Sequence, residues 1–176
     1  MLDYNLDIEY GLDAELLRSL FDYDPLTGLF TWRNNRSNVK AGAVAGCFDA
    51  SGYWQITVLN RSRKAHRLAY LYMTGSWPTL HIDHINQVRH DNRWKNLRVA
   101  NDAQNNANRL VRRDSASGLK GVIWVSKKHR WRAHIRHGGR SRHLGYFLTA
   151  QLAHEFWCLA SDLIHGEFSN HGDRHD

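Results

Sequence analysis

One polar stretch of the chain, residues 81–108, gathers side chains that together could hydrolyse a phosphodiester. It reads HIDHINQVRHDNRWKNLRVANDAQNNAN. His84 could accept a proton from water near neutral pH, because an unperturbed imidazole titrates near pH ~6.5. Its neighbour Asp83 and the more distant Asn105 offer oxygen ligands, which suit Mg²⁺ or Mn²⁺ and suit zinc poorly. The stretch therefore predicts a hard-metal site beside a general base.

The spacing of two asparagines completes this hypothesis. Asn96 follows His84 by twelve positions and Asn105 follows it by twenty-one. The side-chain oxygen of Asn96 could accept a hydrogen bond from one ring nitrogen of His84, leaving the other nitrogen as the base. A bound metal would stabilise the charge that develops on phosphate and on the leaving oxygen. The same residues also fit a polar turn in which asparagines cap the backbone, and the residues alone leave both interpretations open.

Two short strands and a helix, predicted from the spacing of apolar and polar residues, would have to bring these residues together. Residues 80–85 and 97–100 alternate as strands do, with a long polar loop between them. Asn101 stands where a helix N-cap belongs, before the polar helix of residues 102–110. We therefore expect a strand, loop, strand and helix over residues 80–110, with Asp83, His84, Asn96 and Asn105 at one small site.

The chain on the N-terminal side of this stretch predicts a further mixture of helices and strands. Leucines at helical spacing predict a helix, which the turn at Asp24, Pro25 and Gly28 ends. A second helix stops before Gly75 and Pro78. The expected order is helix 12–22, strand 29–33, loop 34–46, strand 53–58, turn 60–64 and helix 66–73.

The pattern changes again after a polar and basic stretch, residues 111–117, which has the composition of a linker. Three strand candidates follow, at 121–126, 130–136 and 141–147, and then a helix at 149–165 between Thr149 and Gly166. We expect an α+β protein. Its expected domains are an N-terminal helix and leader segment at 1–50, a nuclease unit at 51–110, the linker, and a DNA-binding unit at 118–176.

The middle strand of the last unit predicts a sheet with one cationic and one apolar face. Trp131, Ala133 and Ile135 alternate with basic residues, and we expect the apolar face to meet Phe156 and Ala160 of the helix. A ribbon of this width can enter the major groove, where arginine donates two hydrogen bonds to guanine. The expected base-reading residues are Arg130, Arg132, His134 and Arg136, and the expected phosphate contacts are Lys127, Lys128, Arg140 and Arg142.

Charge along the chain favours a polyanionic partner. Residues 1–28 have a balance of −6, whereas residues 29–145 have a balance of +17, and the sequence pI is 9.7. Double-stranded DNA is the first candidate partner. With mean hydropathy −0.60 and no apolar run near the ~20 residues that cross a bilayer, we expect no membrane span. Cys47 and Cys158 are the two cysteines of the sequence, far apart and without a CxxC pair, so they predict neither a disulfide framework nor a cysteine zinc site, and no structural zinc is expected.

Several motifs resemble two known families. HRLAY, IDHIN, DNRWKNLR and QNNAN are similar to the HNH homing endonucleases of phages and mobile introns. GLKGVIWVSKKHRWRAHIR, HLGYF and HGEF resemble the AP2 DNA-binding domain, a three-stranded antiparallel sheet packed on a helix. Ile123 and Val125 depart from the AP2 pattern, which often has arginine in its first strand, so its base code does not carry over. The first resemblance implies a ββα-metal, or His-Me finger, nuclease unit.

The resemblance also implies a role for each site residue. His84 would be the general base, Asn96 would polarise it, and Asp83 and Asn105 would bind one divalent ion, Mg²⁺ or Mn²⁺. Arg93 would shape the loop together with Asn92 and touch a phosphate. His66, at a recurrent family position, would pack or contact phosphate.

The activity implied is a metal-dependent endonuclease that leaves a 5′-phosphate and a 3′-hydroxyl. One such site cuts one strand, so we expect a monomer or a dimer that forms on DNA. We expect the protein in the cytoplasm, and in the cytoplasm of the host cell if a phage encodes the chain. Two rival hypotheses stay open, a non-catalytic sequence-specific DNA-binding regulator and an RNA-binding protein.

Overall fold

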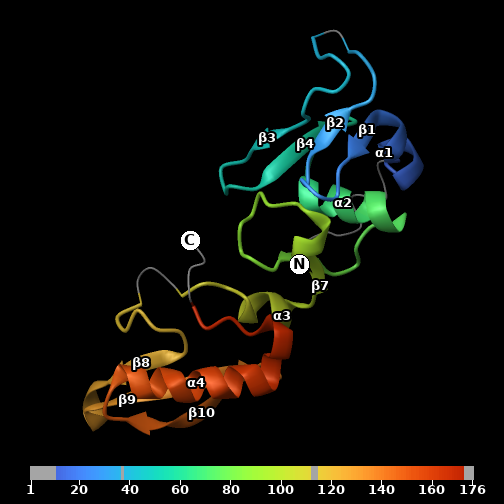
Figure 1. Ribbon diagram of the computed structural model, residues 1–176. Helices are drawn as coiled ribbons and strands as arrows, with labels where there is room; N and C mark the ends of the chain where they lie inside the picture. The colour runs from blue at the N-terminus through green and yellow to red at the C-terminus, as the bar shows by residue number, and fades with distance from the viewer. Residues whose placement is uncertain (1–10, 37, 112–114, 173–176) are drawn as a thin grey trace. The chain divides into compact units, whose positions relative to one another are not determined.

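The computed structural model describes residues 11–36, 38–111 and 115–172. Contacts along the chain divide it into two compact units, Met1–Ala100 and Asn101–Asp176. Both units mix helices with small antiparallel sheets (Figure 1). The expected linker at 111–117 lies partly outside the described residues. Across the described ranges, no helix combines the length and the apolar character needed to cross a membrane.

The first unit is built from two helices and three small sheets in its described part. Strand β1 pairs with β2, β4 lies between β3 and β5, and β6 pairs with β7. All of these pairs are antiparallel. The elements are α1 (Ala14–Leu20), β1 (Phe21–Tyr23), β2 (Phe30–Trp32), β3 (Cys47–Phe48), β4 (Trp54–Val58), β5 (Arg61–Lys64), α2 (Ala65–Thr74), β6 (His81–His84), the 3-10 turn η1 (Trp94–Asn96) and β7 (Leu97–Ala100).

A single apolar core joins the leader segment to the elements that follow it. Leu17 of α1, Phe21 and Phe30 of the first sheet, Ile56 of β4 and Leu68 of α2 are all buried in one cluster. The expected boundary between residues 50 and 51 therefore runs through this core, whereas the division between units comes after Ala100. The leader is part of the framework on which the candidate site is built.

The expected turn at residues 60–64 is wrong, because most of it forms strand β5. Leu59 and Asn60 adopt positive φ angles of 50° and 60°, so two residues complete the turn. Turns of this kind match the twist of the flanking strands and make a tight hairpin. Val58 then pairs with Arg61, and the pairing continues to Lys64 opposite Gln55. Sequence patterning missed β5 because RSRK has no apolar alternation.

The second unit contains a short helix, a three-stranded antiparallel sheet and a long helix. Asn101 caps the short helix through a reciprocal bond with Gln104, which confirms the predicted N-cap. Thr149 caps the long helix, also as predicted. The elements are α3 (Asp102–Ala107), β8 (Val122–Val125), η2 (Ser126–Lys128), β9 (Arg130–His137), β10 (Arg140–Phe147), α4 (Ala150–His165) and η3 (Gly166–Phe168), with β9 central in the sheet.

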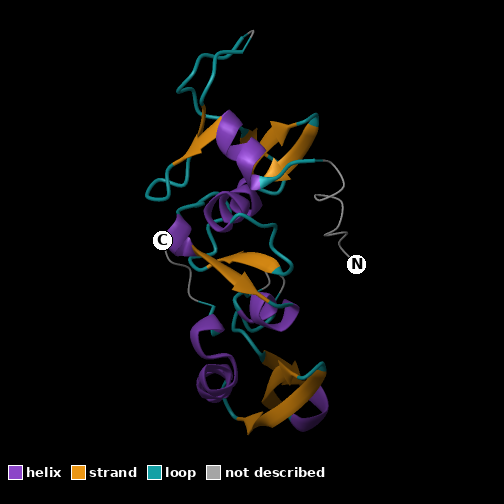
Figure 2. Cartoon of the chain, turned by 90° about the vertical axis from the view of Figure 1, so that its right-hand side faces the viewer, coloured by secondary structure: helices purple, strands orange, loops and turns teal. Residues whose placement is uncertain are grey.

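Helix α4 packs along one face of this sheet (Figures 1 and 2), and two residues that were not expected at the contact are buried there. Ala153 and Trp157 reach the core with Ala133 and Ile135 of β9. Phe156 is 49% exposed and touches the edge residue Phe147, whereas Ala160 lies beside the core. The leucine stripe Leu152, Leu159 and Leu163 faces outward, and Phe156, which was expected to meet the sheet, does so only at its edge.

The rotation of α4 follows from the size of one side chain. The indole of Trp157 fills the space above the sheet and lies against Gly121, where an added Cβ would come within 2.0 Å of the ring. Ala153, which is fully buried, lets the helix approach closely one turn earlier. Because apolar residues surround α4 on several sides, its sequence pattern alone does not determine which side is buried.

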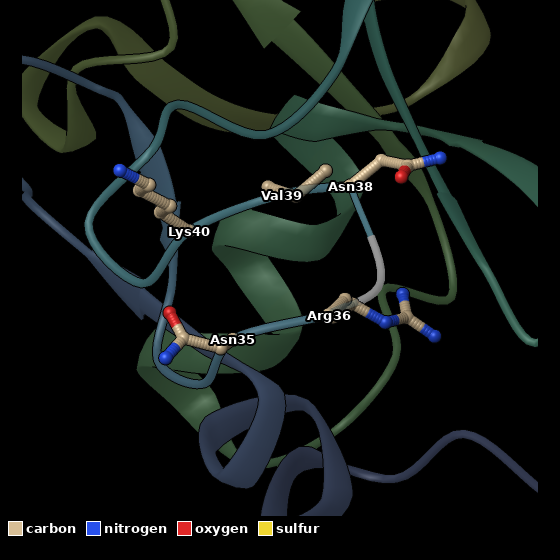
Figure 3. A pocket seen from close by; sticks show the side chains of 5 residues that line it. All are labelled: Asn35, Arg36, Asn38, Val39 and Lys40. Carbon is tan, nitrogen blue, oxygen red and sulfur yellow. The ribbon is translucent and has the colours of Figure 1, made fainter.

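The loop of residues 33–46 encloses a shallow hollow in the first unit. Figure 3 shows the lining side chains on its two opposite limbs, which the backbone pair Arg36 and Val39 joins. Arg36 also lies over the ring of Trp32. The lining residues are Asn35, Arg36, Asn38, Val39 and Lys40, and none of them is a predicted catalytic residue.

Candidate active site

Two predicted site residues lie side by side at the end of β6. Asp83 and His84 are 8% and 5% exposed, and they pair across the hairpin with Arg98 and Leu97 of β7. Arg98 Nε donates to Asp83 Oδ2 at 3.0 Å, so the carboxylate has a cation beside it. The hairpin therefore holds a buried carboxylate and a buried imidazole at successive positions of β6.

The amide that bonds the ring of His84 belongs to Asn92. Asn92 Oδ1 lies 3.2 Å from His84 Nε2. Asn92 Nδ2 donates to the carbonyl of His90 at 3.2 Å, which turns the oxygen toward the ring. Because an amide oxygen can only accept, Nε2 carries the hydrogen and Nδ1 is the unprotonated nitrogen of the neutral ring. The geometry thus assigns Nδ1 as the basic atom.

Asn96, which was expected to polarise His84, holds the loop instead. Its Nδ2 donates to the Asp91 carbonyl at 2.7 Å and to Asn86 Oδ1 at 2.9 Å, while its oxygen accepts from the Asn86 backbone at 3.0 Å. Both ends of the amide are therefore engaged within residues 86–91. Asn96 acts on the backbone just before Asn92 rather than on the imidazole itself.

Two further rings pack against His84. The ring of His66, in the first turn of α2, meets it edge to face at 4.9 Å. Tyr53 lies 5.4 Å from His66 and 6.0 Å from His84, measured between ring centroids. His66 is 7% exposed, and its Nδ1 has no hydrogen-bond partner among the described residues. Packing is therefore the role that the structure gives to His66, one of the two roles expected of it.

Burial favours the neutral form of both imidazoles. It lowers the pKa of His66 well below the usual value, and the ionisable neighbour His84 and the cations Arg67 and Lys64 lower it further. Burial also lowers the pKa of His84, although the bond from Asn92 and the charge of Asp83 act in the opposite direction. A neutral imidazole is the form that can accept a proton from water.

Arg93 is paired within the loop. Its guanidinium bonds both carboxylate oxygens of Asp91, with Nε at 2.7 Å from Oδ1. This hydrogen-bonded pairing lowers the pKa of Asp91 to about 2. Arg93 thus shapes the loop, as predicted, and its charge is engaged by Asp91 in this structure.

Asn105, the second predicted metal ligand, lies on α3 in the second unit and is half-buried. Asp83 at the end of β6 supplies a carboxylate in the first unit. The described residues contain no group of three or more His, Cys, Asp or Glu side chains placed to hold a metal. The carboxylate of Asp83 is a hard oxygen donor, which fits a hydrated Mg²⁺ or Mn²⁺ ion.

The sheet of the second unit separates its cations by face. The four predicted base-reading residues alternate with the buried Ala133 and Ile135 and so share the face away from α4. On that face Arg132 is paired with Ile123 and Tyr146, and Lys128 lies 4.1 Å above the Tyr146 ring. Lys127 lies with Lys128 in η2. Arg140 and Arg142 are exposed on the edge strand, at positions that share the face of Ile135.

A comparison with known families locates the nuclease signature. Residues 63–107, about a quarter of the chain, match the HNH endonuclease family. The match includes His66, Asp83, His84, Asn92 and Asn96, and it extends to Asn105 on α3. No curated protein and no solved structure matches the chain. The chain therefore carries an HNH endonuclease domain, and it is a nuclease that hydrolyses phosphodiester bonds.

Proposed function

We propose that the chain is a divalent-metal-dependent DNA endonuclease of the homing type, directed to double-stranded DNA by the sheet of its second unit. The observation that carries this proposal is the buried Asp83 and His84 pair, with the tautomer of His84 fixed by Asn92, inside the segment that matches HNH endonucleases. A nuclease domain of this kind acts on DNA, and the basic central part of the chain suits that substrate.

In the proposed mechanism the chain's residues position a base and a water molecule. Nδ1 of His84 takes a proton from the water as its oxygen attacks phosphorus. The bond between phosphorus and the 3′ oxygen breaks, the 3′ oxygen takes a proton from solvent to become the 3′-hydroxyl, and the other product strand keeps a 5′-phosphate. Asn92 accepts from Nε2–H and so stabilises the imidazolium that forms. Asn96 maintains the loop that carries Asn92.

Asp83 is the residue of the first unit that would hold the metal, and Mg²⁺ or Mn²⁺ is the ion that its carboxylate oxygens favour. When bound, such an ion stabilises negative charge on the phosphate and on the departing oxygen. HNH nucleases generally depend on a divalent metal, which supports this assignment. Arg98 holds Oδ2 of Asp83 and thereby fixes the orientation of the carboxylate.

The second unit would supply DNA binding of the AP2 type. A three-stranded sheet with a helix on one face supports this assignment, as does a cationic opposite face that includes Arg130, Arg132 and Arg136. The acids of residues 118–172 all lie on α4 and η3, namely Glu155, Asp162 and Glu167. Because α4 carries no lysine or arginine, the sheet face is the one suited to phosphate.

Cleavage of DNA from the chain's own genetic neighbourhood tests the proposal, because a homing enzyme acts on alleles of its locus. Supercoiled plasmid carrying that DNA is incubated with Mg²⁺ or Mn²⁺ and with the wild type or His84→Ala. We expect nicks or breaks from the wild type and at least about a hundredfold slower cleavage by the variant. His171→Ala is the matched control, because His171 pairs with Asp162 in the other unit. Equal cleavage by His84→Ala, or tight binding without cleavage by the wild type, contradicts the proposal, and the second result favours a DNA-binding regulator.

A further inference from the structure

The turn between β1 and β2, residues 24–29, lies against the segment that carries Asn92. Trp94 N donates to the carbonyl of Pro25 at 3.0 Å. Gly28, with φ of 77°, approaches so closely that an added Cβ would lie 2.4 Å from both Asn92 C and Arg93 N. Only glycine combines this backbone conformation with this contact. The turn is thus fitted to residues 92–94, more than sixty positions further along the chain.

One side chain of the leader bonds this segment directly. Tyr23 Oη donates to the backbone carbonyl of Asn92 at 2.6 Å. Both residues are buried, with exposures of 7% and 2%. The Tyr23 ring packs on Phe30 at 4.7 Å and on Tyr72 at 5.7 Å, so the core fixes where the hydroxyl points. Burial raises the pKa of Tyr23, which keeps the hydroxyl protonated and able to donate.

The contacts form a continuous path from the leader to the imidazole. Tyr23 holds the backbone oxygen of Asn92, and the side chain of Asn92 bonds His84 Nε2. We propose that Tyr23 is a positioning residue for His84, acting through Asn92, and that the leader thereby serves catalysis. This inference rests on the proposed function, since it assumes that His84 is the base.

Tyr23→Phe tests the inference, because it removes the hydroxyl and keeps the buried ring. We expect kcat on cleavable DNA to fall about tenfold at an unchanged KM, since small displacements of a catalytic group are costly. Tyr72→Phe is the matched control: this ring lies in the same core, and its hydroxyl bonds no described residue. We expect the control to cleave at the wild-type rate.

A spectroscopic readout separates positioning from loss of structure. Proton–nitrogen correlation spectra of the imidazoles report which ring nitrogen carries hydrogen, and His84→Ala identifies the His84 signals. We expect the Nε2–H form in the wild type and in Tyr72→Phe, and a mixture of both tautomers in Tyr23→Phe. In Asn92→Ala, the further change Tyr23→Phe should have no additional effect on kcat, because the path is already broken.

The outcomes also distinguish failure of this inference from failure of the proposed function. If Tyr23→Phe keeps both the wild-type kcat and the wild-type tautomer, the positioning role is wrong while His84 stays the base. If Tyr23→Phe and Asn92→Ala reduce kcat additively, the hydroxyl does not act through Asn92, and the inference is equally overturned. If His84→Ala cleaves as well as the wild type, the proposed function fails. The comparison of the His84 tautomer in the wild type and in Tyr23→Phe then still tests whether Tyr23 positions the ring.

Discussion

Asn92 and Asn96 belong to the same loop but bond different partners, so their substitutions should have different effects. Asn92→Ala removes the acceptor for His84 Nε2, and we expect kcat to fall about a hundredfold. Asn96→Ala removes three hydrogen bonds that hold the loop, and we expect it to lower the free energy of unfolding by about 2 kcal/mol. Single-turnover cleavage and urea unfolding of each variant measure the two quantities. A greater loss of stability in Asn92→Ala than in Asn96→Ala would contradict this division of roles.

Helix α4 offers a test of which side packs on the sheet. Trp157→Ala should cost about 3–5 kcal/mol, because it empties a buried site next to Gly121. Leu163→Ala should change stability by less than about 0.5 kcal/mol, because Leu163 is 89% exposed and alanine suits a helix. Chemical unfolding followed through the amide signals of β9 measures both. A large cost for Leu163→Ala would mean that the leucine stripe is covered in solution.

Lys120 connects α3 to the end of the second unit, and its burial makes stability depend on pH. The ammonium group donates at 2.6 Å to the carbonyls of Ala107 and Asn170. Burial lowers its pKa from 10.5 to about 8. Between these values the unfolded chain keeps a proton that the folded chain has lost, so stability rises with pH across this range and not below it. We therefore expect the unfolding free energy of the wild type, minus that of Lys120→Met, to increase from pH 8 to 10.5. A difference that falls with pH would show that the carbonyl bonds raise the pKa instead.

At the scale of the whole chain, local sequence patterns predicted the helices and strands better than they predicted which residues of different elements contact each other. The faces of β9 followed from alternation alone, because neighbouring side chains in a strand point to opposite sides. The partner of His84 could not be predicted, since the loop holds several asparagines and a distant turn at Tyr23 and Gly28 helps to set its path. Nor did any pattern show that the leader shares a core with residues 51–100, because core membership depends on tertiary packing.

The separation of cations in the second unit leads to distinct expectations for DNA binding. If about eight cations engage phosphate, the logarithm of affinity should fall with the logarithm of salt at a slope of about −7. The double variant Lys127→Gln/Lys128→Gln, in η2, should reduce the magnitude of this slope by about 2 and weaken binding to every duplex alike. Arg132→Gln, on the face with Ile123 and Tyr146, should instead weaken binding to the target site by about 1–3 kcal/mol and leave non-specific binding nearly unchanged. Fluorescence anisotropy at several salt concentrations, with target and scrambled duplexes, measures both effects. Equal loss on the two duplexes for Arg132→Gln would assign the sheet to phosphate binding rather than to base reading.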